Sequence, residues 1–172
     1  MLSMRVVGIS EVTKTLRAID KDIVNRARKD LRTGAKPMAD AVRANIPSEA
    51  PMSGMVHNGR TKWQPSGVKV NVKTNFTKRA ETRGTYLVAI VAGSPKDYAR
   101  GAASFQIADI AGRKAKGKTA SGRNMIRVLN ERNGRASRFV YPAALRELPY
   151  VQDVVRGTIR KLQQDYNNRN KR

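Results

Sequence analysis

The strongest chemical signature lies mid-chain, in the stretch FQIADIAGRKAKGKTASGRN at residues 105–124. After an apolar run it contains the pattern G-x-x-x-x-G-K-T, formed by Gly112, Gly117, Lys118 and Thr119. In a P-loop this pattern wraps its backbone around a phosphate, between a parallel strand and the N-terminus of a helix. The pattern therefore raises the hypothesis of a nucleotide hydrolase.

The surrounding sequence argues against a nucleotide site. The sheet behind a P-loop usually needs further βα units, but only 53 residues follow Thr119. No later apolar run ends in an aspartate that could help to hold Mg²⁺. A chain rich in glycine and lysine also matches the pattern easily by chance. We therefore reject the hydrolase and expect no cofactor.

We interpret residues 112–124 instead as a flexible basic loop. Its cations suit phosphates or an acidic protein face, without any reading of bases. These candidates for the DNA path or for partner contact are Arg113, Lys114, Lys116, Lys118 and Arg123. The alternative is a solvated loop that has no partner.

Other residue types offer little catalytic chemistry. The chain has one histidine, His57, and its nearest acid in sequence is Glu49, in a loop broken by prolines. There is no cysteine, and the 13 acidic residues are scattered, so neither a thiolate nor a carboxylate metal site is expected. The prediction is no catalytic residue, no metal and no enzyme.

The loop at residues 47–67 holds the single tryptophan, Trp63, close to Arg60 and Lys62. Trp63 could stack on a base. More often such a tryptophan anchors its loop, either to its own domain or to a neighbouring subunit. We take these three residues as candidates for contact between subunits.

The charge is extreme, because 35 Lys+Arg against 13 Asp+Glu give +22 in 172 residues. The excess is spread along the chain, and it is strongest over residues 51–150. Such a balance indicates an acidic partner, most often nucleic acid or an acidic protein surface. No stretch approaches the roughly 20 consecutive apolar residues of a membrane span. The apolar run at the N-terminus is too short for a signal peptide.

Periodicity places a long amphipathic helix over residues 10–46, with a kink or break near Gly34 and Pro37. Residues 68–111 are predicted to be a sheet. GVKVNVKT alternates as a half-buried strand, TYLVAIVAG reads as a central strand, and SFQIADIAG as a weaker third strand.

The rest of the chain is predicted to hold short elements over residues 125–148, a helix over 151–166 and a polar tail over 167–172. NMIRVLNERNG reads as a short helix or strand, RFVYPAALREL as a strand leading into a helical turn, and Pro149 as an interruption. Together these elements predict one α+β domain over residues 1–172.

The order of these parts resembles the neck or tail-completion proteins of long-tailed double-stranded DNA bacteriophages. The matching segments are Val7-Gly8-Ile9 before the long helix, Tyr98-Ala99 with Phe105 and Gly112, and Phe139 with Pro142-Ala143-Ala144-Leu145. Two segments depart from the family pattern: ADIAG replaces an acidic-aromatic-glycine step, and RFVYPA lacks the proline before its aromatic residue.

The resemblance implies an α+β subunit with a long N-terminal helix packed on a small antiparallel sheet. It implies a homo-oligomeric ring of six or twelve copies at the head-to-tail junction of the virion, assembled in the host cytoplasm. Its partners would be head-closure and tail-terminator or tail-tube proteins, and DNA held in the lumen without sequence specificity. The competing interpretation is a small basic nucleic-acid-binding module, associated with ribosomes or the nucleoid.

Overall fold

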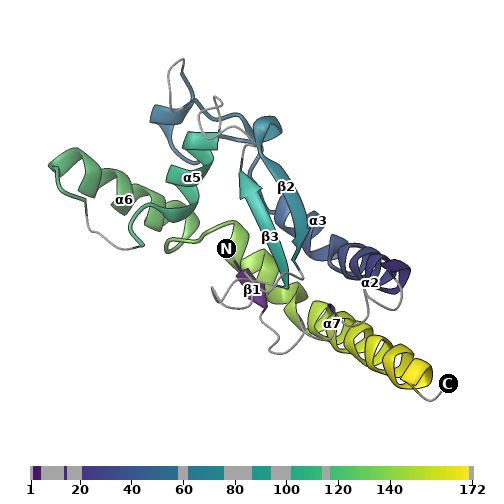
Figure 1. Ribbon diagram of the computed structural model, residues 1–172. Coiled ribbons are helices and arrows are strands. Elements are labelled where there is room, and N and C mark those ends of the chain that lie inside the picture. The colour runs from purple at the N-terminus through teal and green to yellow at the C-terminus, as the bar shows by residue number, and fades with distance from the viewer. Residues whose placement is uncertain are drawn as a thin grey trace. The chain divides into compact units, whose positions relative to one another are not determined.

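The computed structural model describes residues 2–4, 14, 21–57, 62–75, 87–93, 102–113 and 117–170 (Figure 1). The chain divides into two compact units. Unit 1 comprises Met1–Ala39, Asn71–Ile90 and Leu145–Arg172, and unit 2 comprises Asp40–Val70 and Val91–Ala144. The fold class is α+β, which confirms that prediction. Whether the two units form one domain stays a prediction.

The N-terminal helix is bent, as the sequence predicts. Helix α2 (Lys21–Gly34) is followed after one residue by α3 (Lys36–Ala44). The break falls at Ala35, two residues before Pro37, whose ring nitrogen cannot donate the next helical hydrogen bond. Lys14 is also helical, while most of the expected first turns lie outside the described residues.

Three strands form one sheet in the order β1-β3-β2. Strand β1 (Leu2–Met4) pairs antiparallel with β3 (Val88–Gly93), with Leu2 opposite Ile90. Strand β2 (Lys69–Thr74) begins with the expected alternation, because Val70 is buried between exposed Lys69 and Asn71. The first three residues of β3 are all buried, as befits the central strand, whereas the sequence analysis missed β1.

The predicted third strand is wrong, because SFQIADIAG lies in helix α5 (Ala102–Ile110). Burial there follows a helical repeat: Ser104, Phe105, Ala108 and Asp109 are buried, while Gln106 is exposed. The alternation of Phe105, Ile107 and Asp109 is real in the sequence. In the helix, however, Ile107 does not lie on the face that Phe105 and Asp109 share.

Two further boundaries need correction. Helix α6 (Ala120–Asn133) begins inside the segment predicted as the 112–124 loop, so Arg123 is helical. Helix α7 (Val140–Asn170) is continuous for 31 residues and contains Pro149, so neither the strand at RFVY nor the interruption exists. Pro149 costs the helix one backbone hydrogen bond, and α7 has buried residues on both sides of it, Ala143 and Ala144 before and Val151 and Val155 after.

Each unit has its own core. In unit 1, α2 and α7 lie side by side (Figure 1) and bury Ile23, Val24 and Ala27 against Leu162. In unit 2, three aromatic rings meet with centroids 6.2–6.4 Å apart. These rings belong to Trp63, Phe105 and Phe139.

Candidate functional site

The G-x-x-x-x-G-K-T segment joins two helices of unit 2, since α5 ends at Ile110 and α6 begins at Ala120. The element before the pattern is therefore a helix, whereas a P-loop requires a strand there. The threonine of the pattern, Thr119, caps α6 by accepting a hydrogen bond from the Gly122 N–H at 3.1 Å. The letters of the pattern thus have a local structural explanation.

The two glycines of the pattern are required by backbone geometry. Gly112 and Gly117 have φ of 89° and 85°, in the left-handed region that favours glycine. A Cβ on Gly117 would lie 2.8 Å from the backbone nitrogen of Arg123. A Cβ on Gly112 would lie 2.8 Å from a methyl carbon of Ile126. Backbone conformation and close packing thus explain both glycines, with no phosphate needed.

We expect Gly117→Ala to loosen the first turn of α6, because it combines left-handed strain with a backbone clash. The cost should be about 2 kcal/mol, of which the strain alone accounts for about 1. Hydrogen exchange of the α6 amides would measure it. Gly134→Ala is the control for strain without a clash, since Gly134 has φ 79° and open space around it. Equal protection of α6 in wild type and Gly117→Ala would contradict the assignment.

The predicted cations of this segment are only partly placed together. Arg113 and Lys118 are exposed, one after α5 and one before α6. Arg123 is exposed on α6 and donates from Nη1 to the Lys118 carbonyl at 3.3 Å. Lys114 and Lys116 lie outside the described residues.

Helix α6 carries further cations beyond residue 124, outside the predicted basic loop. Arg127 and Arg132 are exposed on the helix, and Arg135 is exposed just after it. The only acid on α6 is Glu131, which accepts a hydrogen bond from Arg127 at 2.7 Å. The signal was present in the sequence, because Arg123 and Arg127 stand four residues apart. Assigning residue 123 to a loop hid that helical spacing.

A buried arginine holds the C-terminal ends of α5 and α6 together. Arg138 is only 5% exposed, and its guanidinium donates to the carbonyls of Ala108, Ala111 and Gly134 at 2.8–3.1 Å. It also donates to Oδ1 of Asn130 at 2.6 Å. A cation here satisfies carbonyls that a helix end leaves without partners. All its donor nitrogens are thus engaged inside unit 2, so Arg138 is not part of an exposed basic surface.

Asp109 completes this arrangement at the start of α7. It is 6% exposed, and its Oδ1 accepts from the backbone N–H of Phe139 at 2.7 Å and of Val140 at 3.3 Å. Burial lowers the pKa of Arg138, and the negative charge of Asp109 partly opposes that shift. An arginine stays protonated in proteins, so a buried cation and a buried anion link three helix ends.

The candidates for contact between subunits are differently exposed. Trp63 is 8% exposed within the core of unit 2, and its Nε1 donates to the Pro47 carbonyl at 2.9 Å. Its indole therefore anchors the loop to its own unit. Lys62 is half-buried, Arg60 lies outside the described residues, and their contact with a neighbouring subunit stays a prediction. His57 is exposed.

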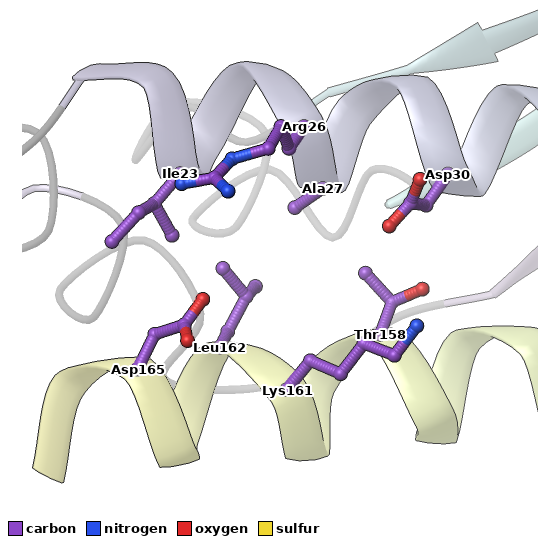
Figure 2. Close-up of a pocket in the computed structure, with 8 residues that line it drawn as sticks. All are labelled: Ile23, Arg26, Ala27, Asp30, Thr158, Lys161, Leu162 and Asp165. Atoms are coloured by element: carbon purple, nitrogen blue, oxygen red, sulfur yellow. The ribbon is translucent and has the colours of Figure 1, made fainter. Parts of the chain in front are cut away.

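Unit 1 contains a small open groove between α2 and α7, with a volume of about 140 Å³. Figure 2 shows the helices running antiparallel, with Ala27 and Leu162 pointing toward one another. Two basic and two acidic side chains also line the groove, and their charges sum to zero: Arg26, Asp30, Lys161 and Asp165. The groove therefore has no net preference for an anionic ligand.

The described part of the chain offers neither a metal centre nor a membrane span. No group of three or more His, Cys, Asp or Glu side chains gathers among these residues to hold a metal ion. No helix among them is long and apolar enough to cross a membrane.

Comparisons with known proteins identified no relative of this chain. No protein-family model matches the chain, and neither curated proteins nor solved structures give a significant match.

Proposed function

We propose that this chain is a structural subunit of a tailed bacteriophage, located at the head-to-tail junction of the virion. Copies of it form a closed ring, six or twelve in number, that joins the capsid connector to the tail and surrounds the DNA path. Its neighbours are head-closure proteins on one side and tail-terminator or tail-tube proteins on the other. The subunit assembles in the host cytoplasm.

The observation that carries the proposal is the order of elements along the chain. A long bent N-terminal helix, an antiparallel sheet and a long C-terminal helix follow one another as the resemblance to neck and tail-completion proteins implies. The differences from expectation are α5, which stands where a third strand was predicted, and the start of α6 inside the predicted basic loop. They leave that order intact.

Packing within unit 2 also supports the proposal, because two of the matching segments lie together. The rings of Phe105 and Phe139 lie 6.4 Å apart, and Ala143 and Ala144 are fully buried. Residues that recur in a family for their packing are expected at such positions. The other matching segments, Val7-Gly8-Ile9 and Tyr98-Ala99, lie outside the described residues.

The charge is consistent with a place beside DNA. A ring around a duplex gains from diffuse positive charge that carries no sequence information. The net charge of +22 supplies it.

Quantitative peptide mass spectrometry on purified particles tests the proposal, scaled to a virion protein of known copy number. We expect about six or twelve copies per particle, the numbers of closed cyclic rings. Absence from particles, with the chain instead co-purifying with cellular RNA or DNA, would overturn the proposal. The basic nucleic-acid-binding module would then be favoured.

A further inference from the structure

The outer face of α6 carries arginines with little opposing charge. Arg123, Arg127 and Arg132 are exposed on it, and α6 contains no lysine and one acid. At 3.6 residues per turn Arg123 and Arg127 lie about 40° apart around the helix, Arg132 lies about 140° beyond Arg127, and the three span about 13 Å of its length. Leu129 is buried about 160° from Arg127. We define this surface as the α6 arginine face.

We propose that the α6 arginine face binds the phosphate backbone of duplex DNA. The inference deepens the proposed function and rests on it for the place of DNA beside the protein. The planar guanidinium forks of arginine match phosphate oxygens in pairs. The continuous array of phosphates on DNA can engage all three arginines, whereas one or two carboxylates of an acidic protein would engage only some of them.

The side chains of α6 favour a duplex over a single strand. Single-strand binders stack unpaired bases on aromatic rings, and α6 has no aromatic residue. Reading the edge of adenine would require a free amide side chain. Asn124 is instead bonded to Arg127 at 2.9 Å and Asn130 to Arg138 at 2.6 Å. The exposed cations left on α6 are arginines, which bind phosphate oxygens and can also pair with guanine in the major groove.

Both ends of α6 are held, so little conformational freedom is given up on binding. Thr119 caps the first turn, and Arg138 bonds to Asn130 and Gly134 at the last. A surface organised in advance loses less conformational entropy on binding than one that must first become ordered.

The first test is the triple variant Arg123→Gln/Arg127→Gln/Arg132→Gln, assayed with a labelled mixed-sequence duplex over a range of salt concentrations. The slope of log K against log salt should fall by about 2.7, at about 0.9 for each phosphate that the variant no longer neutralises. Affinity at low salt should fall at least tenfold. The control Lys29→Gln/Arg32→Gln/Lys36→Gln removes the same charge from exposed positions on α2 and α3. An equal decrease in DNA affinity in both variants would show that the effect comes from net charge alone, and it would overturn the proposal.

A second variant is expected to bind DNA more tightly, an effect that misfolding would not produce. Glu131→Gln removes the only acid of α6 and frees Arg127 from its 2.7 Å ion pair. Affinity should rise by up to about eightfold at 0.1 M salt, the value of neutralising one further phosphate. Unchanged or weaker binding would contradict the proposal. Displacement of DNA from the wild-type protein by polyglutamate, at an equal concentration of negative charge, would also contradict the proposal. It would indicate an acidic protein as the partner.

The DNA assay and the copy-number measurement test the two proposals separately. If particles contain the ring but the α6 triple variant binds DNA as wild type does, the arginine-face inference is wrong and the proposed function stands. If the variant loses binding and the chain is absent from particles, the proposed function fails and the surface belongs to a nucleic-acid-binding module.

Discussion

Replacing Arg138 with methionine is expected to destabilise unit 2 by about 3–5 kcal/mol, the range for removing one member of a buried charged network. The methionine fills much of the volume but donates no hydrogen bond. The carbonyls of Ala108, Ala111 and Gly134 are each deprived of the donor that Arg138 supplies. The buried carboxylate of Asp109 is also deprived of its neighbouring positive charge.

Urea unfolding followed by Trp63 fluorescence measures this effect selectively, because Trp63 is the single tryptophan and lies in the core of unit 2. Arg135→Met is the matched control, since Arg135 is exposed three residues away. It should change stability by less than about 0.5 kcal/mol. Arg138→Lys should remain well below wild type, because an ammonium cannot span three carbonyls as a guanidinium does. Wild-type stability in Arg138→Met would show that the network contributes little.

Gly34→Ala is expected to destabilise unit 1, although alanine is the better helix former. Gly34 is the last residue of α2, and a Cβ there would lie 2.2 Å from Cγ1 of Val154 on α7. Helix propensity favours alanine by about 1 kcal/mol. Forcing one methyl into a packed interface costs about 1–3 kcal/mol, and the branched side chain of Val154 has few rotamers with which to escape. The net destabilisation should be up to about 2 kcal/mol.

Circular dichroism during urea unfolding would follow this destabilisation, together with hydrogen exchange of the α2 and α7 amides. Gly157→Ala is the control, because Gly157 lies within α7 with no atom near its missing Cβ. It should stabilise by about 0.5–1 kcal/mol. The double variant Gly34→Ala/Val154→Ala should recover part of the stability, with a coupling energy of at least about 0.5 kcal/mol. If Gly34→Ala stabilises as much as Gly157→Ala does, the helices do not approach closely at this point.

Predictions from the sequence succeeded where one local signal dominated. The spacing from Ile23 to Val42 is helical, and Pro37 cannot donate a backbone hydrogen bond, so the bent helix was readable directly. Alternation at the start of β2 and the apolar run of β3 were equally clear. The acidic partner that the net charge of +22 indicates stays a prediction.

The sequence by itself thus determined the α+β class, the bend, the two main strands and the excess of positive charge. Only the tertiary structure decided that SFQIADIAG forms helix α5, because the segment by itself suits a strand and a helix equally. The helix is selected by ring contacts of Phe105 with Trp63 and Phe139, and by hydrogen bonds from Arg138 to the carbonyls at its end. The tertiary structure also decided that Pro149 stays within α7 and that Arg123 belongs to a helical arginine face. The physical reason is range: periodicity and proline act within a few residues, whereas the interactions that select between two local conformations join residues about 30 or more positions apart in sequence.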